Sequence, residues 1–130
     1  MHDLLFDRDH RVLLVRLQPR FDGEAVEGLQ EAGRLFVARE GRVDSVIDFS
    51  PVEEVTVAVD TLASRALQRP VMGDYLRVYV MPRDDIQGLG QMFASNQRIT
   101  GSRAPVVVRS MDDAFATLGL FDPKFEAVVL

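Results

Sequence analysis

Cysteine is missing from the 130-residue sequence, and histidine occurs only twice, as His2 and His10. Without cysteine, the chain cannot form disulfides, thiolate nucleophiles, or cysteine-based zinc and iron–sulfur sites. Both histidines lie near the start of the sequence, and their spacing matches no metal-binding motif. We therefore expect no metal site and no cofactor.

No apolar run in the sequence approaches the roughly 18 residues that a membrane span requires. The first residues are acidic and contain too few apolar side chains for a signal peptide. The formal net charge is -5, and the sequence lacks the dense basic stripe of a nucleic-acid-binding protein. These absences predict a cytoplasmic protein that neither spans a membrane nor binds nucleic acid.

The length and composition are those of one globular domain. Hydrophobic residues make up 47% of the chain and charged residues 27%, which is ordinary for folded proteins. A length of 130 residues is also close to the commonest domain size. We expect a single domain over residues 1–130. Its C-terminal tail, residues 121–130, carries apolar side chains that predict docking on this domain or on a neighbouring molecule.

Short apolar runs alternate with segments whose apolar residues recur at helical spacing. The strand-like runs are residues 4–6, 12–17, 43–49, 75–81 and 105–108. The helical patterns begin near Asp22, Ser50, Asp84 and Ser110. The order β-β-α-β-α-β-α-β-α predicts an open α/β fold, with one mixed, mostly parallel sheet of about five strands and four flanking helices. The first strand is expected to run antiparallel to the second, because the turn between them is short.

The start of the second helix has two interpretations. Residues 50–53 (Ser-Pro-Val-Glu) match a capping box with proline at the first helical position. The β-branched residues 55–57 (Val-Thr-Val) oppose this early start, because such side chains lower helix propensity. They favour a later onset, after a structured loop.

Three stretches match the pattern of a known family. They are residues 14–17 with 21–25 (Leu-Val-Arg-Leu and Phe-Asp-Gly-Glu-Ala), residues 46–52 (Val-Ile-Asp-Phe-Ser-Pro-Val) and residues 106–114 (Val-Val-Val-Arg-Ser-Met-Asp-Asp-Ala). Together with the element order over residues 3–120, they resemble STAS and SpoIIAA-like domains, the type found in bacterial anti-sigma factor antagonists and sulfate-transporter tails. The resemblance implies the STAS fold and a regulatory role that is exerted through a protein partner.

One pair of positions departs from that family. Family members that are switched by phosphorylation carry an Asp-Ser pair shortly after the Asp-apolar-Ser stretch, and the corresponding residues here are Thr56 and Val57. Valine has no hydroxyl group, and Ser64 lies too far along the second helix to replace the missing serine. We therefore expect a binding module without the phosphoserine switch.

Ligands of open α/β sheets bind beyond the carboxyl ends of the parallel strands. The residues that the predicted order places there are Asp48, Ser50, Thr56, Arg83, Asp84, Asp85 and Arg109. The two arginines and two helix N-termini suit a small anionic ligand.

These polar residues also have structural interpretations. Ser50, Asp84, Asp85 and Ser110 suit helix caps. Asp48 either binds backbone amides in its own loop or pairs with Asp84 or Asp85 as a general acid or base.

A Gly-Leu-Gly sequence, residues 88–90, lies within the third helical pattern. A dinucleotide motif requires such glycines between a strand and a helix, so that interpretation fails. We expect these glycines to allow close packing of the helix on the sheet or on a second chain.

These observations predict a non-catalytic regulatory or protein-interaction module, with a homodimer as one form of the interaction. The alternative is a domain of the same architecture that binds a small molecule or lipid in a pocket between sheet and helices. We do not expect an enzyme, because cysteine is absent and both histidines lie far from the predicted site.

Overall fold

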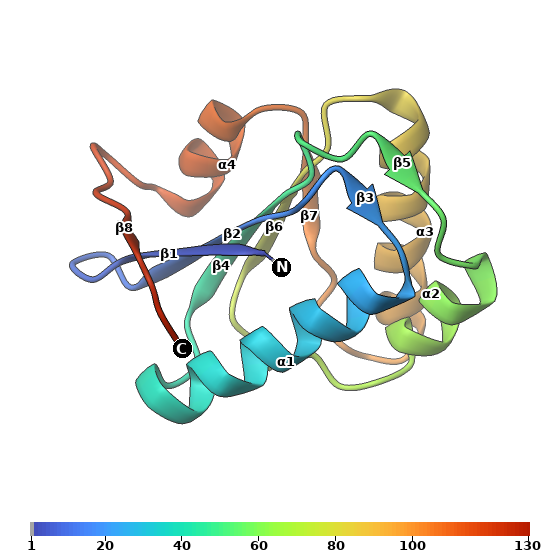
Figure 1. Cartoon of the computed structure of the whole chain (residues 1–130), viewed down its shortest axis with the longest axis horizontal. Helices are drawn as coiled ribbons and strands as arrows, with labels where there is room; N and C mark the ends of the chain where they lie inside the picture. Colours follow the sequence, from blue (N-terminus) through green and yellow to red (C-terminus); the bar gives the residue numbers. More distant parts are fainter. Residues whose placement is uncertain (1) are drawn as a thin grey trace.

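A computed structural model describes residues 2–130 (Figure 1). The strands in this part of the chain are β1 (Asp3–Asp7), β2 (Val12–Arg16), β3 (Arg20–Phe21), β4 (Asp44–Asp48), β5 (Glu54–Val55), β6 (Arg77–Val80), β7 (Val106–Val108) and β8 (Glu126–Ala127). The helices are α1 (Gly23–Glu40), α2 (Val59–Ala66), α3 (Asp84–Ile99) and α4 (Met111–Leu118). None of these helices is both long enough and apolar enough to cross a membrane.

The main sheet of the described chain is mixed and has six strands, in the order β7-β6-β4-β2-β1-β8. Strands β2, β4, β6 and β7 are parallel, whereas β1 runs antiparallel to β2 and β8 runs antiparallel to β1. The predicted α/β fold with a mostly parallel sheet is confirmed. The predicted count of about five strands was one too low, because the tail adds β8.

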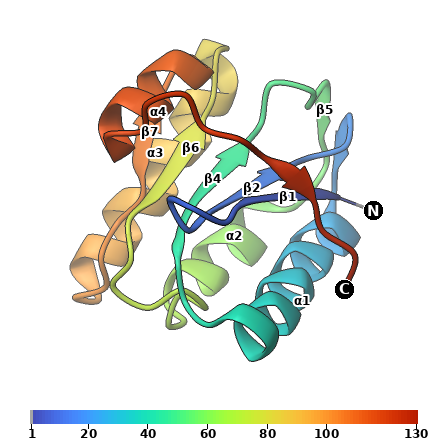
Figure 2. The same cartoon turned by 90° about the vertical axis from the view of Figure 1, so that its left-hand side faces the viewer.

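The helices divide unequally between the two faces of this sheet. Parallel strands that follow one another in the chain are also neighbours in the sheet. Right-handed crossovers therefore place the helices that connect these strands on a single face of the sheet. Helices α1, α2 and α3 pack with the larger core on that face, and α4 packs with a smaller core on the other. Figure 2 shows the sheet lying between α1 and α4.

The second helix follows the later of the two predicted starts. Residues 50 and 51 form a turn, and after residues 52 and 53 the chain pairs Glu54 and Val55 in parallel with β3. The amides of Glu53 and Glu54 both donate to the carbonyl oxygen of Pro19, which holds this segment away from a helical path. The capping-box interpretation was therefore wrong, and α2 begins at Val59.

The C-terminal tail docks on its own domain. Strand β8 pairs with β1, and the amide of Val128 donates to the carbonyl oxygen of Leu4 at 2.8 Å. The amide of Lys124 donates to Oδ2 of the buried Asp7 at 2.9 Å. The tail thus covers the edge that β1 would otherwise expose, as Figure 2 shows.

Candidate functional site

The loops at the carboxyl ends of the parallel strands lie together, as the element order predicts. Nη1 of Arg83 donates to the carbonyl oxygen of Val52 at 2.8 Å, which joins the loop after β6 to the loop after β4. Nη1 of Arg109 donates to the carbonyl oxygen of Pro82 at 3.3 Å, which joins the loop after β7 to the loop after β6. The two predicted arginines therefore tie three loops into one edge, here called the carboxyl edge.

The charges at the carboxyl edge are already paired with one another. Arg83 lies 3.2 Å from Asp85, and Arg109 lies 2.7 Å from Asp84. The hydrogen bond from Arg83, with one from the amide of Ile86, lowers the pKa of the Asp85 carboxyl group. An incoming anion would have to displace these carboxylates.

Asp48 supports its own loop. Its carboxylate is buried, its Oδ1 accepts a hydrogen bond from the amide of Ser50 at 2.9 Å, and its Oδ2 lies 3.5 Å from Nε of Arg16. Asp84 and Asp85 are bonded instead to Arg109 and Arg83. These contacts match the loop-binding interpretation of Asp48 rather than a carboxylate pair for acid–base chemistry.

The predicted helix caps form only in part. The hydroxyl of Ser110 accepts from the amide of Asp113 at 3.1 Å and caps α4. Asp85 Oδ1 accepts from the adjacent amide of Ile86, but none of the described residues caps α3 through its side chain. Ser50 and Thr56 are exposed, Ser50 in the turn after β4 and Thr56 directly after β5.

The two histidines serve the fold. Nδ1 of His10 lies 2.8 Å from Oδ2 of Asp7, and Nε2 of His2 lies 2.8 Å from the carbonyl oxygen of Ala25. Across residues 2–130, no three histidine or acidic side chains gather as metal ligands would.

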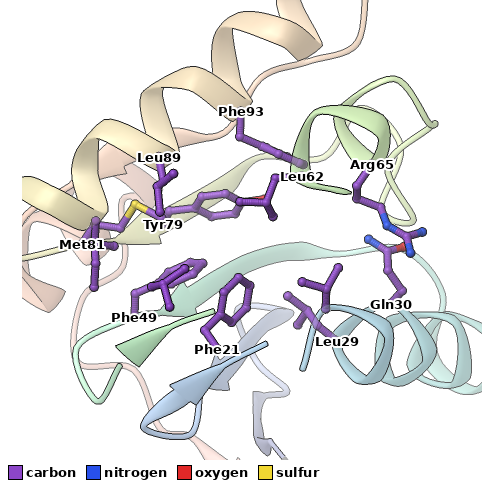
Figure 3. A pocket seen from close by; sticks show the side chains of 14 residues that line it. Phe21, Leu29, Gln30, Phe49, Leu62, Arg65, Tyr79, Met81, Leu89 and Phe93 are labelled. Carbon is purple, nitrogen blue, oxygen red and sulfur yellow. The ribbon is translucent and has the colours of Figure 1, made fainter. Parts of the chain in front are cut away.

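A second location lies between the sheet and helices α1, α2 and α3, where the alternative prediction expects a pocket for a small molecule or lipid. It is a cavity of about 80 Å³, here called the aromatic cavity (Figure 3). Its aromatic lining is Phe21, Phe49, Tyr79 and Phe93. Its aliphatic and thioether lining is Val26, Leu29, Val55, Leu62, Met81, Ile86 and Leu89.

The aromatic rings form a continuous series across the aromatic cavity. Ring centroids lie 5.5 Å apart for Phe21 and Phe49, 5.5 Å for Phe49 and Tyr79, and 6.3 Å for Tyr79 and Phe93. The series begins at β3, passes beneath the helices and ends on α3. The small β3–β5 sheet therefore supplies one wall of the cavity, and nothing in the sequence pattern predicted that sheet.

A second cavity of about 80 Å³ adjoins the first and shares Leu29, Gln30, Arg65, Tyr79 and Phe93 with it. We call it the polar cavity, because it adds Ser45, Arg77 and Gln97 to the lining.

The Nη atoms of Arg77 have partners in the polar cavity, whereas its buried Nε has none among the described residues. Nη2 of Arg77 donates to Gln97 Oε1 and to the carbonyl oxygen of Arg103, both at 2.6 Å, and Nη1 lies 3.5 Å from the hydroxyl of Tyr79. Burial raises the pKa of the Tyr79 phenol, although the neighbouring Arg77 partly opposes this shift. Tyr79 therefore remains a neutral phenol.

Gly90 brings α3 close to the sheet at the edge of the aromatic cavity. A Cβ atom at this position would overlap Sδ of Met81 and would lie 3.4 Å from Cγ2 of Val107. A Cβ atom at Gly88 would meet nothing within 4 Å among the described residues. Close packing on the sheet is thus the role of Gly90 and not of Gly88.

A scan against protein-family models finds no match to this chain, and a search of curated proteins finds no similar sequence.

Proposed function

We propose that this chain is a non-catalytic, STAS-like regulatory domain that binds a small, mostly apolar molecule between its sheet and helices α1, α2 and α3. The aromatic cavity carries the proposal. Protein interiors are normally packed so closely that voids larger than a water molecule are few. An apolar cavity remains dry and accepts apolar molecules; one of about 150 Å³ holds benzene, so the aromatic cavity, at about 80 Å³, must widen before a ligand enters.

Helix α2 is the wall through which a ligand would enter. It has eight residues, and its N-cap Ala58 makes no side-chain capping bond with any described residue. A missing cap costs a helix about 1 kcal/mol, so α2 is less firmly held than α1, which Asp22 caps. An outward shift of α2, which carries Leu62 and Arg65, would enlarge the aromatic cavity toward the size of an ordinary ligand site.

The chemistry of the carboxyl edge supports a binding role over catalysis. A general base works best when its pKa lies near the operating pH. Arg83 holds the pKa of Asp85 below its ordinary value, and Asp84 is paired with Arg109. Asp85 is therefore a weak base, and the charge of Asp84 is already balanced by Arg109.

A matched pair of glycine variants tests the proposed ligand site. In Gly90→Ala, the new methyl group displaces the Met81 thioether, and the free space beside Met81 is the aromatic cavity. Gly88→Ala makes the same change on α3 without reaching the cavity. We expect N-phenyl-1-naphthylamine, a neutral probe that fluoresces in apolar surroundings, to bind the unmodified chain and Gly88→Ala equally.

Gly90→Ala should bind this probe about fivefold more weakly, a difference of roughly 1 kcal/mol. Helix propensity favours alanine over glycine by about 1 kcal/mol, so neither variant should lose folded structure in a thermal melt. Equal affinity in all three proteins, or no binding by the unmodified chain, would contradict the proposal.

The carboxyl edge supports a second candidate, contact with another protein molecule. Its exposed ion pairs, Arg83 with Asp85 and Arg109 with Asp84, present both signs of charge side by side. A two-fold interface needs such a self-complementary surface, which makes a second copy of this chain the fitting partner.

Analytical ultracentrifugation tests this second candidate, because it measures the mass of the species in solution. We expect a species of twice the 14.6 kDa chain mass, which Arg109→Glu converts to monomer by placing a like charge beside Asp84. The control Arg34→Glu, on the exposed side of α1, should leave the dimer intact. A monomer at every concentration would rule the homodimer out.

A further inference from the structure

We propose that the ligand of the aromatic cavity, once α2 has moved outward, is an amphipathic carboxylate, an acyl chain whose head binds Arg65 while its tail lies among Phe21, Phe49, Leu62 and Phe93. This inference rests on the proposed ligand site and adds the chemical class of the ligand. Three features carry it: the position of Arg65, the weakness of its present partners, and the polarity gradient along the cavity.

Arg65 is the only charged side chain among the 14 described residues that line the aromatic cavity. It lies in the last turn of α2, and its side chain is only 16% exposed. Figure 3 shows Arg65 beside Gln30 at one end of the cavity, with Met81 at the other. One end of the cavity is therefore cationic and hydrogen-bonding, and the other is apolar.

The present partners of Arg65 are easily replaced. Nη2 is paired with Glu27, whose side chain is 64% exposed, and Nη1 donates to Gln68 Oε1 at 2.9 Å. Glu27 is the exposed member of this pair, so water and salt screen its charge and its side chain can turn into solvent. A ligand carboxylate can take the place of Glu27 and accept two parallel hydrogen bonds from the guanidinium, and Gln30 offers an amide donor beside it.

A single negative charge fits this end of the cavity better than a phosphate does. Only one guanidinium lines the aromatic cavity within the described chain, and the carboxylate of Glu27 lies next to it. A doubly charged head would leave excess negative charge near Glu27. Arg77 differs from Arg65 because its Nη atoms already bond to Gln97, the carbonyl oxygen of Arg103 and the Tyr79 hydroxyl, and only its buried Nε lacks a partner among the described residues.

Competition for the neutral probe separates head recognition from tail recognition. Decanoate and decan-1-ol carry tails of equal length and differ in the charge of the head. Each would be titrated against bound N-phenyl-1-naphthylamine at neutral pH. The proteins are the unmodified chain, Arg65→Gln, and the control Arg34→Gln, which removes an arginine from the exposed ion pair with Glu31 on α1.

We expect decanoate to bind the unmodified chain about tenfold more tightly than decan-1-ol, which corresponds to about 1.4 kcal/mol. Arg65→Gln should abolish this preference by weakening the binding of decanoate, and a thermal melt like that of the unmodified chain would show that the variant is folded. Arg34→Gln should keep the preference, and added salt should reduce it, because the head lies near the surface.

Two results would overturn the inference while leaving the proposed ligand site intact. One is equal affinity of the unmodified chain for decanoate and decan-1-ol. The other is a preference for decanoate that survives Arg65→Gln and is lost in Arg77→Gln, which would place the head in the polar cavity. If neither the probe nor decan-1-ol binds at all, the proposed ligand site itself fails.

Discussion

Replacing Phe36 with alanine should lower the free energy of unfolding by about 3–5 kcal/mol, the largest effect we expect of any single substitution. Phe36 lies on α1 and is 0% exposed, and its ring meets that of Phe6 on β1 edge to face, with centroids 5.1 Å apart. Truncation removes the buried ring and its contact with the Phe6 ring, and it leaves a cavity that the surrounding helix and sheet cannot fully close.

Urea unfolding followed by circular dichroism measures this change. The matched control is Phe121→Ala, because Phe121 is 88% exposed at the start of the tail. Its loss should change the free energy of unfolding by less than about 0.5 kcal/mol. A loss below about 1 kcal/mol for Phe36→Ala would mean that α1 is not packed on β1 as described, since buried phenylalanines rarely cost so little.

Replacing Asp7 with asparagine should lower the free energy of unfolding by about 2–3 kcal/mol at neutral pH. Oδ1 of Asp7 accepts from the amide of His10, and Oδ2 accepts from the amide of Lys124 and lies 2.8 Å from His10 Nδ1. Asparagine keeps only one side-chain oxygen as an acceptor. Its NH₂ group then faces the remaining donors, with which it cannot form the lost hydrogen bonds. The substitution therefore loosens both the β1–β2 turn and the tail.

The effect of Asp7→Asn should depend on pH. Burial alone would raise the pKa of Asp7, but the hydrogen bonds from the His10 and Lys124 amides and from the His10 ring lower it overall. Because the pKa of Asp7 is lower in the folded state, the unfolded chain binds more protons in acid. The contribution of Asp7 to the free energy of unfolding is therefore full above the ordinary pKa of aspartate. It is lost as the pH falls through the pKa of Asp7 in the folded state.

The difference in unfolding free energy between the unmodified chain and Asp7→Asn should therefore shrink as the pH falls below the ordinary pKa of aspartate. The control Asp9→Asn changes an exposed aspartate in the same turn and should show no comparable dependence. A constant difference over this fall in pH would contradict the role assigned to the Asp7 carboxylate.

Much of the main fold follows from local sequence pattern. The alternation of apolar runs and helical spacing predicts β1, β2, β4, β6 and β7 and the parallel arrangement of the last four, because right-handed crossovers leave few other topologies. Asp22 and Ser110 mark two helix starts correctly, since each side chain accepts a bond from a nearby helix amide.

The missed elements are those that depend on contacts between distant segments. Strands β3, β5 and β8 have two residues each, and a two-residue strand has no periodicity for a pattern to detect. They exist because Pro19 accepts from the Glu53 and Glu54 amides and because Leu4 accepts from Val128. Such pairings appear only once the main sheet has brought the partners together.

The two candidate sites differ in how far the sequence could predict them. Arg83, Asp84, Asp85 and Arg109 were placed correctly at one edge, because position in an open sheet follows from element order. Their mutual ion pairing was not predictable, since it depends on side-chain geometry. In the sequence, the residues of the aromatic cavity cannot be told from ordinary core residues. The spacing of Phe21, Phe49, Tyr79 and Phe93 along the chain is the same whether or not their side chains leave a gap between them.

The most direct test of the central claim, that an apolar ligand occupies the aromatic cavity, is a titration of methyl-labelled protein with decanoate followed by NMR. We expect the methyl resonances of Leu29, Leu62 and Leu89, which line the cavity, to shift with saturation. Those of Leu5, Leu118 and Leu120, which pack with the smaller core on the α4 face, should not move. Shifts confined to the α4 face, or no shifts at saturating decanoate, would contradict the claim.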